Sequence, residues 1–192
     1  MSRSPRILTI PSRLVSGWEG VNVWSGYGHS IIESPELRFV EREPAETDLS
    51  LKQLVVYAVV KNSEGQVLVY TRGKSGGEDR LHDLLSVGVG GHIDEPDIDH
   101  THSLYRELDE ELGVKDFTTG LIGILNSEES DVDRVHVGLL FVVTLDEGVD
   151  ITAEDCIKDF HWVESRDLEK LIPQMERWSQ IATECLLDIN LI

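Results

Sequence analysis

The sequence predicts an α+β fold with one main domain and an N-terminal appendage. Residues 53–60 form an apolar, β-branched run, which is typical of a strand buried on both faces. Residues 104–112 repeat leucine at the spacing of one helical face. The chain of 192 residues, 40% of them hydrophobic, is long enough for one substantial core. We therefore expect residues 1–50 to form a β-rich extension and residues 51–192 the main domain.

The N-terminal extension carries weaker patterns. Three short stretches alternate polar and apolar residues as half-buried strands do, at 6–10, 21–24 and 37–41. Three large aromatic residues lie among glycines: Trp18, Trp24 and Tyr27. Such residues more commonly form a small satellite core than a pocket or a dimer contact. The polar residues 41–46 are typical of a linker.

The main domain is predicted to begin with a hairpin. A turn at 62–65 joins the first run to a returning strand at 66–72. Further strands follow at 117–125, 135–143 and 159–163. A helix is expected from Ser165, as its N-cap, to residue 172, where Pro173 ends it. Apolar residues then recur at spacings of three and four on one face of a C-terminal helix: Met175, Trp178, Ala182, Cys185 and Ile189.

The helix over 104–112 concentrates negative charge. Glu107, Glu110 and Glu111 stand at i, i+3 and i+4, on one face, and Gly113 suits the left-handed residue that ends a helix. Such carboxylates repel one another unless a cation compensates them, and Mg²⁺ or Mn²⁺ is the hard cation that oxygen ligands prefer. Arg106 can hold a neighbouring carboxylate in one rotamer. The alternative is a solvated acidic helix with an ordinary surface ion pair.

The composition narrows the range of partners and compartments. The net charge of −19, without a basic patch, argues against binding a nucleic-acid backbone. No apolar run has the length of a membrane span or of a signal peptide, so a cytoplasmic protein is expected. Cys156 and Cys185 lack metal or redox spacing and are expected to be reduced and buried. The histidines that flank the acidic helix lack zinc-ligand spacing: His92, His100 and His102.

Residues 106–114 resemble the second half of the motif of the Nudix (MutT-like) hydrolases, G-x5-E-x7-R-E-U-x-E-E-x-G-U, where U is aliphatic. Every defined position from Arg106 to Val114 matches the motif. The first half departs from it. Counted from Gly91, the isolated glutamate falls on Asp97, and eight residues instead of seven then precede Arg106. We interpret this as a one-residue insertion in the loop, with Asp97 or Glu95 acting as the isolated acid.

The resemblance implies an α/β/α sandwich around a mixed sheet, and a Mg²⁺- or Mn²⁺-dependent hydrolase that cleaves a diphosphate linkage. The substrate would be a nucleoside di- or triphosphate, or a nucleoside diphosphate linked to another moiety. The implied metal ligands are the Gly90 carbonyl, Glu107, Glu110 and Glu111, with Arg106 orienting a carboxylate. A carboxylate of the motif, such as Glu107 or Glu110, or an acid of the 126–134 loop would accept the proton of the attacking water; the loop candidates are Glu128, Glu129 and Asp131.

Three basic or imidazole side chains are candidates for substrate contacts. Arg72 and Lys74 follow the hairpin and are candidates for phosphate contacts, although solvated loop charges are an equal alternative. His92 follows the paired glycines and is a candidate for lining the substrate site. Family members often use N-terminal additions for substrate choice or dimerisation, so a homodimer is possible.

Two other functions remain open at this point. One is a non-catalytic nucleotide-binding or regulatory Nudix domain, although such domains commonly lose carboxylates that this chain keeps. The other is an isoprenoid diphosphate isomerase, which needs a catalytic cysteine near the site, whereas Cys156 and Cys185 lie in the C-terminal segments.

Overall fold

The computed structural model describes residues 5–23, 30–73, 84–155 and 157–192. Four sequence predictions concern residues outside these ranges: Trp24, Tyr27, Lys74 and Cys156. The strands are β1 (Arg6–Pro11), β2 (Gly20–Val23), β3 (Arg38–Glu41), β4 (Leu51–Lys61), β5 (Val67–Arg72), β6 (Leu85–Ser86), β7 (Gly88–Val89), β8 (Phe117–Asn126), β9 (His136–Leu145) and β10 (Ile157–Val163). The helices are η1 (Ser12–Leu14), α2 (Arg42–Ala45), α3 (His100–Leu112), η3 (Asp133–Val135), α4 (Ser165–Leu168), η4 (Ile172–Gln174) and α5 (Arg177–Asp188).

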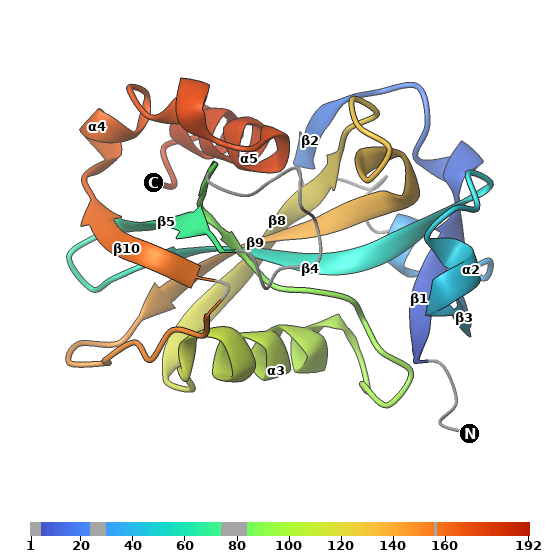
Figure 1. Ribbon diagram of the computed structural model, residues 1–192, viewed down its shortest axis with the longest axis horizontal. Coiled ribbons are helices and arrows are strands. Elements are labelled where there is room, and N and C mark those ends of the chain that lie inside the picture. Colours follow the sequence, from blue (N-terminus) through green and yellow to red (C-terminus); the bar gives the residue numbers. More distant parts are fainter. Residues whose placement is uncertain (1–4, 24–29, 74–83, 156) are drawn as a thin grey trace.

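A mixed sheet forms the middle layer, with α3 against one face and α5 against the other (Figure 1). Its strand order is β10-β5-β4-β9-β8-β2, and β4 pairs with β9 in parallel while β4 pairs with β5 in antiparallel orientation. The α+β sandwich predicted from the sequence is confirmed.

The central strand β4 supplies side chains to both cores. Its first ten residues are buried, as its apolar sequence predicts. Leu54 and Val56 pack with the leucines of α3, whereas Val55 and Tyr57 pack with Trp178 of α5. Because side chains alternate along a strand, β4 fixes both helices to one framework.

The helix α3 has the predicted C-terminal end and an earlier start. Gly113 ends it at φ 67, in the left-handed conformation that glycine adopts without strain. The helix begins at His100 because Asp99 is the N-cap, where its carboxylate accepts a hydrogen bond from the His102 amide at 2.9 Å.

Predictions for two polar segments were wrong. Residues 41–46 are not a linker, because Arg42–Ala45 form the helix α2 and Ala45 is buried. The helix predicted from Ser165 to residue 172 stops at Leu168, and its N-cap is Glu164. Pro173 instead lies inside η4.

The C-terminal helix is α5, and a buried glutamate fixes its start. The Glu176 carboxylate accepts hydrogen bonds from the Trp178 and Ser179 amides at 2.8 and 2.9 Å and from the Tyr57 hydroxyl at 2.8 Å. Cys185 is a free thiol that is only partly buried, which corrects the expectation of full burial.

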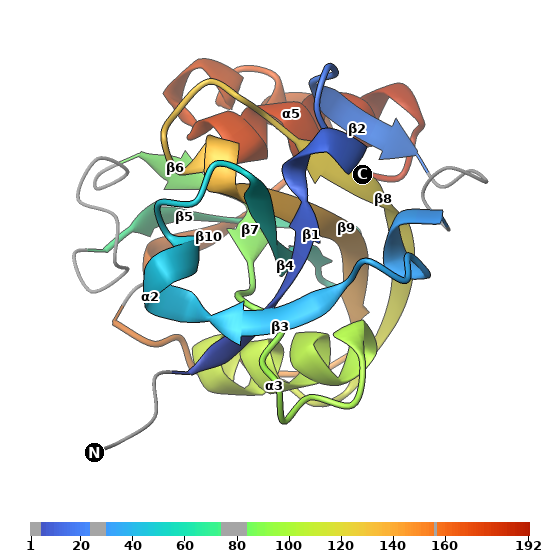
Figure 2. The ribbon, with the colours of Figure 1, turned by 90° about the vertical axis from the view of Figure 1, so that its right-hand side faces the viewer.

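The N-terminal strands join the same sheet as the rest of the chain. Thr9 of β1 pairs with Gln53 of β4, and β2 pairs with β8 along Gly20–Val23. Seen from the side, β1, β3 and α2 lie together at one end of the molecule (Figure 2). A boundary at residue 50 stays a prediction. Within the described ranges, no helix has the length and apolar character needed to cross a bilayer.

Candidate active site

The glycines of the motif bring a loop close to both β4 and α3. The Gly91 carbonyl accepts a hydrogen bond from the Val56 amide at 2.8 Å. Gly90 has φ +146, and a Cβ atom there would lie 2.1 Å from the Val56 carbonyl oxygen. A Cβ on Gly91 would lie 2.6 Å from Oε1 of Glu107. Only glycine therefore permits this approach of the loop to strand and carboxylate.

Arg106 joins the loop to the helix. Its guanidinium donates to both carboxylate oxygens of Asp97 at 3.0 and 3.2 Å, and to the His92 carbonyl at 2.9 Å. It also donates to Oε1 of Glu107 at 2.7 Å and to Oε2 of Glu110 at 3.2 Å. The two hydrogen bonds from Arg106 to Asp97 give Asp97 the contact expected of the isolated acid. Glu95, the alternative, pairs with Arg6.

The environment of Asp97 favours its charged form. Burial opposes ionisation, but hydrogen bonds from Arg106, Ser103, the Asp94 amide and His102 outweigh burial and hold the pKa of Asp97 well below its usual range. The insertion in the loop is therefore accommodated without loss of the Arg–carboxylate pair. Ile98, which follows Asp97 in this loop, is 86% exposed.

Glu107 and Glu111 are two partly buried carboxylates one helical turn apart. Burial raises the pKa of Glu107. Burial, and then the charge of Glu107, raise the pKa of Glu111 to about 7. Oε2 of Glu111 accepts a hydrogen bond from the Gly90 amide at 3.3 Å. Both carboxylates thus carry an electrostatic penalty that a bound cation would relieve.

The donor set fits a hard divalent cation that keeps part of its water shell. Glu110 is 57% exposed and turned toward Arg106. No group of three or more His, Cys, Asp or Glu side chains within the described ranges is arranged to hold a metal. Mg²⁺, however, commonly uses one or two carboxylates, with waters and substrate phosphate completing its shell. Glu107, Glu111 and the adjacent Gly90 backbone match that requirement.

A cleft of about 680 Å³ opens beside these carboxylates. Of the residues predicted from the sequence, it brings together Arg72, Gly90, His92, Arg106, Glu107, Glu111 and Glu129. The other two loop acids are held elsewhere. Glu128 pairs with the buried Lys52 at 3.0 Å, and Asp131 is 74% exposed beside Arg134.

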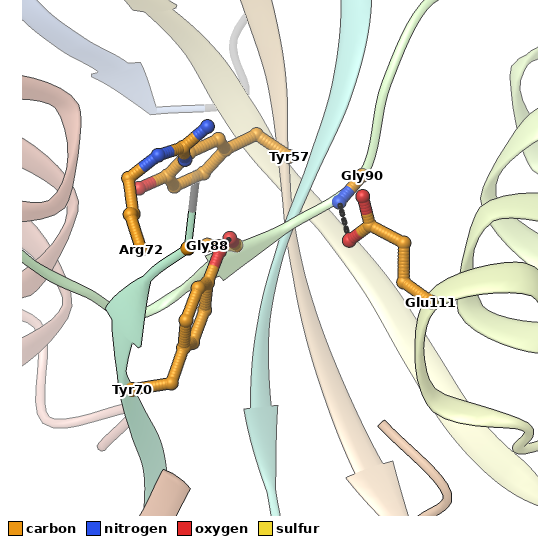
Figure 3. A pocket seen from close by; sticks show the side chains of 7 residues that line it. Tyr57, Tyr70, Arg72, Gly88, Gly90 and Glu111 are labelled. Carbon is orange, nitrogen blue, oxygen red and sulfur yellow. Dashed lines mark hydrogen bonds between the residues drawn. The ribbon is translucent and has the colours of Figure 1, made fainter. Parts of the chain in front are cut away.

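A smaller cavity of about 90 Å³ adjoins the cleft at Glu111. Figure 3 shows Arg72, Tyr57 and Tyr70 on one side of this cavity and Glu111 on the other. Burial opposes the charge of Arg72, but Tyr70, Glu176, Tyr57 and Glu111 together raise its pKa. Among the residues the structure describes, none forms a hydrogen bond or ion pair with the Arg72 guanidinium, so its donors remain available to an anion.

A pair of histidines, of which the sequence predicted one, lines the cleft. Nε2 of His92 lies 2.8 Å from Oε1 of Gln53 and 3.2 Å from Nε2 of His136. Burial lowers the pKa of His92 to about 3, and burial also lowers the pKa of His136. Both rings are therefore neutral near pH 7. His136 carried no sequence signal, because it begins β9 without a recognisable motif.

Lys52 is a second residue that sequence reasoning missed. Its side chain is 1% exposed, and Nζ donates to the carbonyls of Ser127, Asp133 and His136 at 3.1, 2.7 and 3.2 Å. Together with its ion pair to Glu128, these bonds fix the loop that carries Glu129. In the sequence Lys52 only borders an apolar run.

The N-terminal extension also reaches the site. Arg42 and Glu46 of the α2 region line the cleft. The Leu8 amide donates to the Ile93 carbonyl at 2.8 Å, which ties β1 to the loop of the motif. No sequence pattern indicated either contact, since both depend on how β1 and α2 pack beside β4.

Comparisons with known proteins agree with this geometry. The family model described as NUDIX domain matches residues 51–183. Protein YmaB of Bacillus subtilis (strain 168) is 33% identical over 164 residues, 78% of each chain. The crystal structure of Tm1382, assigned to the Nudix hydrolases, has a TM-score of 0.78 and 27% identity and covers 96% of this chain and 99% of its own. The Nudix domain of Shewanella oneidensis NrtR, complexed with ADP ribose, shares the fold at 18% identity and a TM-score of 0.56, over 72% of this chain and 88% of its own.

Proposed function

Since this chain belongs to the Nudix hydrolase family, we propose that it hydrolyses a diphosphate linkage with the help of Mg²⁺ or Mn²⁺. The proposed substrate is a nucleoside di- or triphosphate, or a nucleoside diphosphate joined to another group. One observation carries the proposal: Glu107 and Glu111 lie partly buried and side by side at a large cleft, where both pKa values are raised. Such an arrangement is unfavourable in a purely structural helix and useful beside a cation.

Glu107, Glu111 and the Gly90 carbonyl are the proposed metal ligands. Glu110, at the mouth of the site, is a further ligand candidate that must leave Arg106 to reach a metal. The chemistry that a bound divalent ion supplies is neutralisation of charge on adjacent phosphates and a lowered pKa of water. Arg106 keeps Glu107 in position, and Asp97 in turn keeps Arg106 in position.

Arg72 is the proposed phosphate contact. It lies across a small cavity from Glu111, and a planar guanidinium binds phosphate in a bidentate manner. Lys74, two residues further on, remains a sequence prediction for the same role. His92 lines the cleft and belongs to the substrate-facing wall.

Glu129 is the proposed acceptor of the proton from the attacking water. Of the three candidate acids in its loop, it is the one that lines the cleft. It is held by Arg177 at 3.0 Å and is 65% exposed, so it can be reached by water. Glu128 is committed to Lys52, and Asp131 faces solvent beside Arg134.

The cleft has the size of a nucleotide site. Ligand pockets commonly have volumes of about 300–1,000 Å³, and the cleft of about 680 Å³ falls within that range. The structural relative NrtR binds ADP ribose in its Nudix domain, which supports a small nucleotide-like ligand. Nucleic-acid binding is not expected at a net charge of −19. A cytoplasmic location and a possible homodimer stay predictions.

The proposal is tested with Glu111→Gln. The purified protein is incubated with Mg²⁺ or Mn²⁺ and a panel of nucleoside di- and triphosphates, nucleotide sugars and dinucleoside polyphosphates, and released phosphate or pyrophosphate is measured. We expect the variant to lose about a thousandfold in kcat, because its amide cannot replace a charged metal ligand. Asp109→Asn removes an exposed carboxylate of the same helix and serves as the matched control, with turnover kept.

A second readout separates metal binding from folding. Mg²⁺ should raise the Tm of the natural protein by binding the folded state, and should raise that of folded Glu111→Gln much less. Full turnover by a folded Glu111→Gln protein contradicts the proposal. Mg²⁺ binding without turnover of any substrate supports the non-catalytic alternative.

A further inference from the structure

Two chemically different groups of residues line the cleft at different points along one side of β4. Tyr57 lines the small cavity with Arg72 and Glu111. Gln53, on the same side of β4, contacts His92 instead. Four residues of extended strand span roughly 13 Å, so the two groups can contact different parts of one ligand.

The part at Gln53 is built partly by the N-terminal extension. Nε2 of Gln53 donates to the Ala45 carbonyl of α2 at 3.3 Å, which turns Oε1 toward Nε2 of His92 at 2.8 Å. Figures 1 and 2 show α2 beside β1, at the end of β4 where β1 pairs with residues 51–53. Arg42 and Glu46 extend from this helical turn and line the cleft.

Hydrogen bonds fix the histidine tautomers at this place. Nδ1 of His136 lies 2.8 Å from the Val132 carbonyl and must donate to it, so Nε2 of a neutral His136 accepts. Nε2 of His92, at 3.2 Å, is then the donor to both His136 and Gln53. Nδ1 of a neutral His92 is then an acceptor, and among the described residues no donor to it is found.

The charges at this place cancel. Nε of Arg42 lies 3.0 Å from Oε1 of Glu46, and their side chains are 47% and 40% exposed, so both can reach a ligand. A guanidinium, a carboxylate and an imidazole acceptor offer donors and acceptors without net charge. This set disfavours a phosphate, which Arg72 serves, and suits a neutral group that is rich in hydrogen bonds.

We propose that Arg42, Glu46 and His92 form the subsite for the nucleoside part of the substrate, so that the N-terminal extension determines specificity. This inference rests on the proposed function, since the phosphates must lie at Glu111 and Arg72. Val55 and Tyr57 between the two parts supply the apolar surface that a base requires. Glu46 can accept from ribose hydroxyls or base amino groups, and Arg42 can donate to base carbonyls or ring nitrogens.

The test compares substrates with and without a nucleoside. The kcat/KM of Arg42→Ala and Glu46→Gln is measured for a panel of nucleoside triphosphates and for inorganic tripolyphosphate. We expect each variant to lower the ratio of nucleotide to tripolyphosphate kcat/KM roughly tenfold or more, mainly through KM. Arg13→Ala is the matched control, because it breaks an Arg–Glu pair with Glu36 in the same extension, away from the residues that line the cleft. Ratios in both cleft variants that equal the control's overturn the inference.

Binding separates this inference from failure of the proposed function. If the natural protein turns over no substrate, binding of a nucleoside 5′-monophosphate and of ribose 5-phosphate is measured by calorimetry in a chelator. Tighter binding of the nucleoside monophosphate, with the preference reduced in Arg42→Ala and Glu46→Gln, supports the subsite although the hydrolase proposal has failed. Equal binding of the two ligands, or a preference that both variants keep, overturns the subsite.

Discussion

Two groups of acids, in the 127–133 segment and on α3, differ in how their charge is compensated. The acids of the 127–133 segment each have a partner in the protein: Glu128 with Lys52 at 3.0 Å, Glu129 with Arg177 at 3.0 Å, Asp131 with Arg134 at 3.2 Å and Asp133 with the Ser130 amide at 3.0 Å. Glu111 of α3 has the Gly90 amide at 3.3 Å and the like charge of Glu107 nearby.

This difference distinguishes acids whose charge has a partner within the protein from acids whose charge a bound cation would compensate. A buried carboxylate with a cationic partner contributes to the native structure. A buried carboxylate beside another one destabilises it until a cation binds. The number of acids in a segment therefore says less about function than the compensation of each acid, and the predictions below test that distinction.

The largest effect on stability is expected at the compensated loop. Lys52→Met keeps the length of the side chain but leaves the carbonyls of Ser127, Asp133 and His136 without their donor. We expect a loss of about 3 kcal/mol in the free energy of unfolding, measured by urea denaturation. Lys115→Met, at an exposed ion pair, should change stability by less than about 0.5 kcal/mol.

The comparison of Lys52→Met with Lys115→Met has an outcome that would contradict the prediction. If both substitutions had equally small effects, the buried cation would contribute nothing to the loop, and compensation would not distinguish structural acids. A destabilised Lys52→Met protein that still binds Mg²⁺ at the natural affinity would show that the loop and the α3 carboxylates act separately.

The next effect concerns two acids of the same loop. Glu129→Gln should lower kcat about a hundredfold, which is typical for loss of a general base. Asp131→Asn should stay within about twofold, because Asp131 is 74% exposed beside Arg134. Equal loss in both variants, or in neither, would remove Glu129 from the proposed mechanism.

The elements that the sequence predicted are those whose evidence is local. Glu107 and Glu111 are four residues apart on one helix, so their spacing alone places them on one face. The choice between Asp97 and Glu95 was not local, because it depended on which carboxylate the loop turns toward Arg106.

The residues that were missed depend on long-range pairing. Lys52 reaches His136 because β4 and β9 are parallel neighbours with Gln53 opposite His136, although these two residues are 83 positions apart in the sequence and no spacing rule detects their pairing. The polar composition of residues 41–46 predicts a linker. In the structure, the Arg42–Glu46 pair and the Gln53 contact to Ala45 stabilise a helical turn there.

The smallest of the expected effects lies within the motif itself, at its compensated acid. Asp97→Asn keeps the shape of the side chain but removes the charge that pairs with Arg106. We expect a loss of about 2 kcal/mol in stability at pH 7, since hydrogen bonds to charged groups are the stronger ones. Asp109→Asn, which breaks an exposed pair on the same helix, should cost less than about 0.5 kcal/mol.

The pKa of Asp97 determines how its contribution to stability changes with pH. The pKa of Asp97 lies below its unfolded value of 3.8, so the folded state stabilises the charged form. The stability that Asp97 contributes is therefore complete above a pH of about 4 and is lost as the pH falls further, through the folded pKa. Urea denaturation of natural and Asp97→Asn proteins between pH 7 and pH 3 should show two curves that converge in acid. Curves that stay parallel would mean that Asp97 acts through shape, and that its charge does not hold Arg106.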